Sequence, residues 1–238
     1  MSGRRVWAIF RKEMQEFRRN KQIVSTMAFS PIGFLVAPLI FVFSISASDV
    51  SVLDSYPVLL FTLALAAVLP TVVGAYSITS EREQGTLEPL LATPISAAEL
   101  MLGKALAVFI PSITQCYLIF GVIDALVELI RPAVVSAAAL RPPILLAQLI
   151  FTPLLVCMAV WLSITISAHT RDGRVAQQFG FVANIPVIAL AVLVGFHVIR
   201  ATLPLTLTLG AALVVLDIAG WPLAAKTFDR ERLILGAR

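Results

Sequence analysis

The residue types that most often carry chemistry are few in this chain, and they are not spaced for catalysis. Its one Gly-Lys pair, Gly103-Lys104, is followed by alanine and lacks the upstream glycine of a phosphate-binding loop. The two histidines, His169 and His197, lie in different segments, and neither an HExxH nor a GxSxG motif occurs. We therefore predict no catalytic residue, no metal site and no cofactor bound by this chain itself, which is not expected to be an enzyme.

One short segment is compatible with lipid chemistry in a membrane. Residues 172–177, Asp-Gly-Arg-Val-Ala-Gln, partly resemble the start of the CDP-alcohol phosphotransferase signature, which would imply a divalent metal held by several aspartates. Gln177 stands where that motif has arginine, and no further aspartate occurs before Asp217. A membrane-embedded lipid-modifying enzyme is therefore one alternative function, and a secondary transporter or channel is another.

Polar side chains inside apolar runs are a second kind of candidate. Asp217 lies eight residues from the end of the last apolar run, or about 12 Å along a helix. A charge near the bilayer centre costs about 2.5–3.5 kcal/mol on insertion scales. Asp217 could therefore face a substrate path or a proton relay, or it could pack against another helix. Asn184 and Gln115 complete this possible intramembrane polar site, although such amides more often bond a neighbouring helix than a ligand.

The helices that position these residues are determined by the need to cross a lipid bilayer. Of 238 residues, 59% are hydrophobic and 13% charged, whereas a soluble domain carries about 25% charged residues. The mean hydropathy is +0.94, and six apolar runs reach the roughly 20 residues that a helix needs to cross a bilayer. We predict an all-α polytopic membrane protein with kinked helices, because several prolines lie within the runs. The six predicted spans are Ile23–Ile45, Val58–Ile78, Leu100–Ile123, Ile144–Ser167, Phe179–Ile199 and Ala201–Ala225, within a transmembrane domain of residues 23–225.

Basic residues indicate how the spans are oriented. With the N-terminus in the cytoplasm, 15 of the 18 Lys and Arg fall on the cytoplasmic side, and only Arg131, Arg141 and Arg200 lie outside. The positive-inside rule favours this orientation. We predict a multi-pass protein of a bacterial or archaeal inner membrane, with a cytoplasmic N-terminus and a cytoplasmic basic tail at 226–238. Charges at the ends of apolar runs serve orientation, so no nucleic-acid partner is predicted.

Residues 1–22 are predicted to form an amphipathic helix that lies on the membrane surface. Apolar residues recur on one helix face at spacings of four, four and three: Val6, Phe10, Met14 and Phe17. Polar and basic residues are predicted to lie away from that face: Arg11, Lys12, Gln15, Arg18 and Arg19. The simpler alternative is a basic topogenic tail with no further role.

The cytoplasmic connection 79–99, between the second and third spans, carries its own folding signals. Two matches to the S/T-x-x-E capping box predict that helices begin there: Ser80 with Glu83, and Ser96 with Glu99. Between them, Thr86 can cap a short helix that Thr93-Pro94 ends. Gly85 suits either a positive φ angle or a close approach to another chain. The connection is therefore predicted to be a compact helix–turn–helix unit.

This connection also resembles a known family. Residues 83–94, Glu-Gln-Gly-Thr-Leu-Glu-Pro-Leu-Leu-Ala-Thr-Pro, and residues 100–104, Leu-Met-Leu-Gly-Lys, resemble the E-x-G-T-L-E-x-L-L-x-T-P…L-x-x-G-K signature of type-2 permeases of ATP-binding-cassette (ABC) transporters. Residues 10–13 and 18–21 resemble the amphipathic entry helix of that family, residues 174–178 add support, and the six-span layout covers the chain. The resemblance implies a membrane permease that pairs with a second permease subunit, as a homo- or heterodimer. It also implies two separate ATPase subunits, which would bind ATP and Mg and drive export.

The same resemblance assigns roles to residues. It implies a coupling helix that rests on the ATPase, with the residues Glu83, Gly85, Thr86, Leu87, Glu88, Leu90, Leu91 and Pro94. It implies an elbow helix beside the coupling helix, over about residues 4–20, with Phe10, Arg11, Lys12, Met14 and Phe17. Family members often carry a re-entrant hairpin between spans five and six. Here only about Arg200 separates them, so the outer gate is either missing or formed by residues 124–143.

Overall fold

The computed structural model describes residues 2–45, 57–87, 89, 93, 95–140, 142–195 and 203–227. Within these ranges the regular structure is helical and no strand occurs, so the predicted all-α fold class is confirmed for this part of the chain. The helices are α1 (Gly3–Arg19), α2 (Lys21–Ser44), α3 (Pro57–Glu83), α5 (Ala97–Ile130), α6 (Ala133–Ala139), α7 (Pro142–His169), α8 (Gly173–Gly195) and α9 (Leu203–Thr227).

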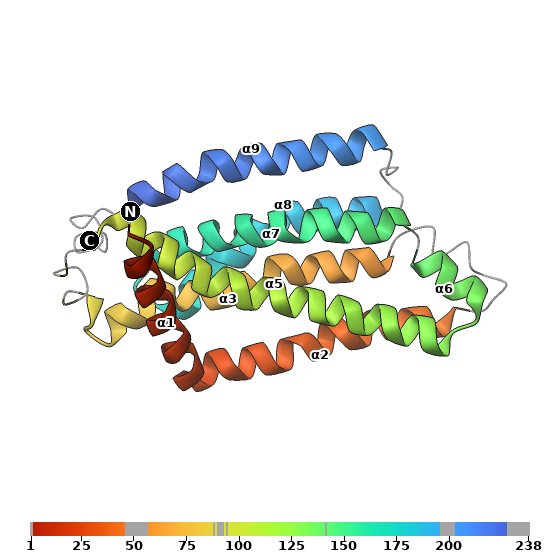
Figure 1. Ribbon diagram of the computed structural model, residues 1–238, viewed down its shortest axis with the longest axis horizontal. Coiled ribbons are helices and arrows are strands. Elements are labelled where there is room, and N and C mark those ends of the chain that lie inside the picture. Colours follow the sequence, from red (N-terminus) through yellow and green to blue (C-terminus); the bar gives the residue numbers. More distant parts are fainter. Residues whose placement is uncertain are drawn as a thin grey trace.

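The long helices form one bundle. In Figure 1, α2, α3, α5, α7, α8 and α9 run alongside one another, α1 crosses their ends, and α6 lies at the opposite end of the bundle. Helix α3 is the centre, because it packs against α2, α5, α7 and α8. Most of its apolar length is buried, whereas most of α2 and α9 faces outward. The core therefore surrounds α3. The C-terminal turns of α3 lie at the end of the bundle that α1 crosses.

Five of these helices are long and apolar enough to cross a membrane. They contain the stretches Ile23–Ser44, Leu63–Glu83, Ala97–Ile130, Ile144–His169 and Leu207–Lys226. The predicted span Phe179–Ile199 lies only partly within the described residues, where it belongs to α8. Large apolar side chains such as Leu118, Leu149 and Val215 are exposed on the outside of the bundle, as lipid-facing residues should be and as a water-soluble surface rarely is.

One of the two predicted capping boxes is present and the other is not. The Ser96 hydroxyl accepts from the Glu99 backbone N–H at 3.2 Å, and the Glu99 carboxylate accepts from the Ser96 N–H at 3.0 Å, so α5 begins as predicted. The prediction that a helix begins at Ser80 is wrong, because α3 continues through it to Glu83. There the Ser80 hydroxyl donates to the Tyr76 carbonyl one turn back, which is the usual role of a serine inside a helix.

Side chains of α5 satisfy two carbonyls that prolines leave without a partner. The Met27 carbonyl of α2 and the Leu149 carbonyl of α7 each precede a proline by four residues, so each lacks its helical N–H donor. Gln115 donates to the Met27 carbonyl at 2.6 Å, and the Tyr117 hydroxyl donates to the Leu149 carbonyl at 3.0 Å. The carbonyls that these prolines leave free in α2 and α7 are thus satisfied from α5, in the manner that membrane helices require.

The predicted outer connection 124–143 is mostly helical. Helix α5 continues past Asp124 and Glu128 to Ile130, and the short α6 follows. At the end of α5, Arg131 donates to the Ile45 carbonyl and lies over the Phe43 ring, 5.6 Å from its centroid. This end of α5 is therefore fastened to the end of α2.

Candidate functional site

Helix α1 lies directly on α5 at the end of the bundle. Its buried face consists of Val6, Ile9 and Phe17, with Glu13 among them. At the contact, a Cβ added to Gly103 of α5 would lie 2.6 Å from Ile9 Cγ2 and 3.2 Å from the Val6 carbonyl oxygen. Glycine at 103 therefore allows α1 to reach the surface of α5.

A fully buried lysine, the residue after Gly103, joins three helices. Lys104 of α5 has 0% of its side chain exposed. Its Nζ donates to Glu13 Oε1 of α1 at 2.7 Å and to the Ser77 carbonyl of α3 at 2.7 Å, and it lies 3.0 Å from Glu81 Oε1 of α3. An ammonium group has three donors, and all three have partners here.

A second lysine completes the group. Lys12 of α1 is partly exposed and forms ion pairs with Glu16 at 2.9 Å, with Glu13 at 3.5 Å and with Glu81. We call Lys12, Glu13, Glu16, Glu81 and Lys104 the elbow network. Its five charges come from α1, α3 and α5, so the network fixes the position of α1 on the other two helices.

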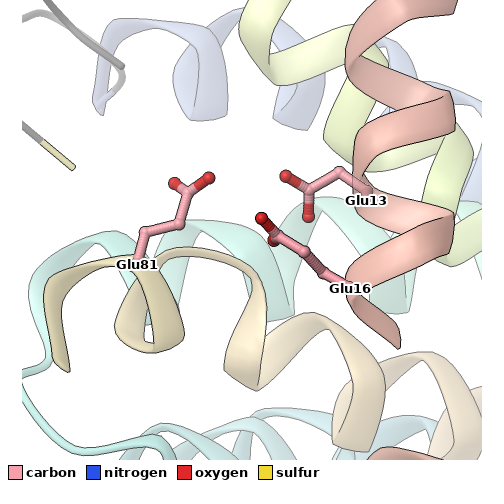
Figure 2. A group of neighbouring side chains, drawn as sticks. All are labelled: Glu13, Glu16 and Glu81. Atoms are coloured by element: carbon pink, nitrogen blue, oxygen red, sulfur yellow. The ribbon is translucent and has the colours of Figure 1, made fainter. Parts of the chain in front are cut away.

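The carboxylates of the elbow network converge, as Figure 2 shows: Glu13 and Glu16 extend from α1 towards Glu81 on α3. Their oxygens lie within 4.8 Å of one another, a spacing that would also suit a metal ion. However, the ammonium groups of Lys12 and Lys104 already pair with these carboxylates. Two cations against three anions leave one net negative charge. The arrangement is an ion-pair network, and the spacing alone does not make it a metal site.

Burial and charge act against each other in this network. Burial raises the pKa of Glu13, while the charge of Lys104 opposes that rise. Burial works to lower the pKa of Lys12, but the carboxylates of Glu13 and Glu81 outweigh it and raise that pKa. Each charge is thus tolerated only because its partners are present, and removal of one member of such a buried group typically costs about 3–5 kcal/mol.

The start of α1 is also attached to the start of α5. The Ser2 backbone N–H donates to Glu99 Oε1 at 2.7 Å, and Arg5 lies 3.6 Å from Glu99 Oε2. Glu99 therefore both completes its own capping box with Ser96 and anchors α1. Helix α1 consequently touches both α3 and α5, the two helices that flank residues 84–96.

The end of α3 is fixed on its other side as well. Arg82 donates to the Thr170 carbonyl and, at 3.2 Å, to the Ala168 carbonyl, both at the end of α7. The Glu83 carboxylate accepts from the Gly173 N–H at 3.4 Å, at the start of α8. These contacts are typical of basic groups at helix C-termini and acidic groups at N-termini. The end of α3 thus holds α1, α5 and the α7–α8 connection together.

The predicted coupling residues lie just beyond this fixed point. Gly85 is exposed and has a φ of 68°, the positive value that glycine adopts without strain. The Thr86 N–H donates to the Glu81 carbonyl at 2.9 Å, and Leu87 is buried, with 6% of its surface exposed. Glu83, the first of the set, ends α3. The remaining predicted coupling residues, Glu88, Leu90, Leu91 and Pro94, lie outside the described residues.

The elbow residues are only partly placed as predicted. Phe17 is buried, Phe10 and Met14 are half-buried, and Arg11 is exposed. Lys12 is partly exposed, and its ammonium group turns towards Glu81 on α3.

Four members of the elbow network were missed as site residues: Glu13, Glu16, Glu81 and Lys104. The available signal was Lys104, a charge only four residues into a predicted span, where an unpaired ammonium group is costly and a partner is required. The sequence does not show which carboxylates provide that partner.

The intramembrane polar residues do not form one site. Asn184 of α8 donates to Thr71 Oγ1 of α3 at 2.9 Å, and Asp217 Oδ1 of α9 accepts from Trp161 Nε1 of α7 at 3.0 Å. With Gln115 bonded to α2, each of the three joins a different pair of helices. Asn184 and Gln115 thus have the interhelical role that the sequence favours.

The segment that resembles a phosphotransferase signature also has a local role. Asp172 precedes α8 and accepts from the Arg174 N–H at 2.7 Å. This is the bond of an N-capping residue.

Comparison with known protein families gives a match over most of the chain. A family model described as ABC-2 family transporter protein matches residues 7–195. The matched stretch runs from α1 to the end of α8 and includes the whole elbow network. No curated protein matches the chain.

Proposed function

This chain belongs to the ABC-2 family of transporter proteins, and from this membership we propose that it couples ATP hydrolysis on a separate subunit to export through the membrane. Membership and the apolar helices make it a multi-pass membrane permease of an ABC transporter, which is a transport component. The coupling step, the outward direction and the residues that perform them are our proposal.

The observation that carries the proposal is the rigid anchorage on both sides of residues 84–96. On one side the elbow network and Arg82 tie the end of α3 to α1, α5 and α7. On the other side the Ser96–Glu99 capping box and the Ser2 contact fix the start of α5 to α1. A push on residues 84–96 would therefore move several helices together, whereas a flexible loop would absorb it.

Charge supports a cytoplasmic location for this end. Every described Lys and Arg except Arg131 belongs to α1, to a helix end near it or to the α7–α8 connection, and these lie at the same end of the bundle in Figure 1. The positive-inside rule then favours α1 and residues 84–96 on the cytoplasmic side, where ATP is available. Arg131 lies at the other end, beside α6.

The proposed assembly follows from this placement. Residues 1–22 form the elbow, residues 23–225 the six-span domain with the coupling segment 79–99, and residues 226–238 a cytoplasmic tail, in a bacterial or archaeal inner membrane. Two permease subunits, identical or different, enclose the pathway. Two ATPase subunits bind ATP and Mg. One of them docks on residues 84–96 of each permease subunit.

Site-directed crosslinking tests the docking. In a variant in which both native cysteines are replaced by alanine, Gln84→Cys and Ala137→Cys place single thiols at exposed positions near opposite ends of the bundle. We expect Gln84→Cys to crosslink to the co-expressed ATPase and Ala137→Cys, the matched control on α6, to give no crosslink. A crosslink from Ala137→Cys, or none from Gln84→Cys while the complex still co-purifies, would show that the ATPase docks elsewhere.

A further inference from the structure

An apolar crevice lies between α1 and α5 on the outside of the bundle. Its volume is about 430 Å³, and it is lined by Gly3, Trp7 and Phe10 of α1 and by Leu102, Leu106 and Ile110 of α5. We call it the elbow crevice. Its volume falls in the range of about 300–1,000 Å³ that is typical of ligand pockets. The lining is apolar, so it suits an apolar occupant.

The crevice is elongated towards the membrane interior. Leu102, Leu106 and Ile110 follow one another at four-residue spacing, so they form a stripe along one face of α5. Eight residues of helix span about 12 Å, measured from the level of α1 into the apolar length of the bundle. Ile110 is 42% exposed and Trp7 is 63% exposed. The crevice is therefore open along its outer side, and its shape fits a hydrocarbon chain better than a compact solute.

The rim of the crevice at α1 is cationic. Arg4 and Arg11 lie three residues before and four residues after Trp7, on the same side of α1, and both are exposed. Within the described residues neither forms an ion pair, whereas Arg5 and Lys12 on the other side are paired with acidic groups. A guanidinium group can bond two oxygens of a phosphate at once, and tryptophan favours the level of lipid headgroups.

From these features we propose that the elbow crevice binds an anionic phospholipid of the leaflet at the α1 side. One acyl chain lies along Leu102, Leu106 and Ile110 beneath Trp7, and the phosphate lies between Arg4 and Arg11. The lipid would then fill the space between α1 and α5 on the side opposite the elbow network. This inference depends on the placement of α1 at the membrane surface and not on ATPase docking.

Quenching of Trp7 fluorescence tests the proposal on the full chain in nanodiscs. The discs contain phosphatidylcholine with increasing mole fractions of chain-brominated phosphatidylglycerol or, in parallel, of chain-brominated phosphatidylcholine. The Trp7 signal is the difference between wild type and Trp7→Phe. We expect half-maximal quenching at a lower mole fraction of brominated phosphatidylglycerol than of brominated phosphatidylcholine. Arg4→Gln and Arg11→Gln together should reduce this preference, by about fivefold for each arginine.

Two matched controls separate a built site from general attraction to the surface. Arg18→Gln with Arg19→Gln removes the same charge from exposed positions at the other end of α1 and should keep the preference. Gly3→Leu should fill the crevice and reduce quenching by both lipids, while Gly33→Leu on α2 should not. A Cβ at either glycine meets no atom within 4 Å, so both variants should fold. Equal quenching by the two lipids in wild type, equal loss in the two arginine pairs, or unchanged quenching in Gly3→Leu would each overturn the proposal. None of these readouts involves the ATPase.

Discussion

Lys104 shows how much a single residue contributes to this end of the molecule. Its side chain has no exposed surface and lies between Glu13, Glu81 and the Ser77 carbonyl. A buried ion pair is weak evidence for stability in itself, but the loss of one partner leaves a buried charge without compensation. The elbow network is therefore best tested by comparing removal of one charge with removal of a pair.

We predict that Lys104→Met destabilises the purified chain by about 3–5 kcal/mol. Adding Glu13→Gln should recover part of that loss, because one of the two carboxylates left buried by the first change becomes neutral. Thermal unfolding in detergent measures both effects, with the exposed Lys226→Met as the control. A double variant no more stable than Lys104→Met would show that the unpaired Glu13 carboxylate is not what destabilises the single variant.

A second prediction concerns the backbone at Gly85. Its φ of 68° costs a residue with a Cβ about 1–2 kcal/mol, and asparagine tolerates this region better than alanine does. A Cβ there meets no atom within 4 Å, so space does not limit the substitution. Stability and ATPase co-purification should therefore decrease in the order Gly, Asn, Ala. If alanine and asparagine behaved alike, the backbone angle would not be the reason for glycine.

At the scale of elements, α1 is held by shape as well as by charge. Val6 and Ile9 pack at Gly103, while Glu13 and Lys12 bond α3 and α5 one to two turns further on. Both contacts have to form together, because α1 is rigid and its residues keep a fixed spacing. A larger side chain at position 103 should thus weaken the elbow network, although it would not contact that network directly.

We therefore predict that Gly103→Val displaces α1 and makes its backbone more accessible to a protease. The added Cβ would lie 2.6 Å from Ile9 Cγ2, so α1 or α5 has to move. Limited trypsin digestion should cleave within α1 faster in this variant than in wild type. Gly121→Val is the matched control, because it lies on the same helix and a Cβ there meets no atom within 4 Å. Equal cleavage rates in the two variants would contradict the proposed close packing.

For the whole molecule, the uneven distribution of basic residues predicts the orientation in the membrane. The α1 end holds all the described Lys and Arg except Arg131. Single cysteines at Gln84 and Gln177 should therefore be protected from an impermeant thiol reagent in intact cells. Those at Ala137 and at Ser51, which lies outside the described residues, should react. Labelling at Gln84 with protection at Ala137 would invert the orientation.

Features that depend on a short stretch of sequence were predictable from the sequence alone. A span needs only a local excess of apolar residues, so five of the predicted spans correspond to long apolar helices. The capping box at Ser96 and Glu99 and the positive φ at Gly85 also depend on a few adjacent residues. The family was recognisable from the motif that begins at Glu83, because such motifs are local as well.

The tertiary structure decided which distant residues meet. Ser80 and Glu83 have the same capping pattern as Ser96 and Glu99, but α3 had already begun far upstream, so the pattern lies inside a helix. Glu13, Glu81 and Lys104 are far apart in the chain, and no periodicity relates a lysine in one helix to carboxylates in two others. Their pairing follows from the way α1 crosses α3 and α5. There a buried ammonium group is stable only where packing brings carboxylates within reach.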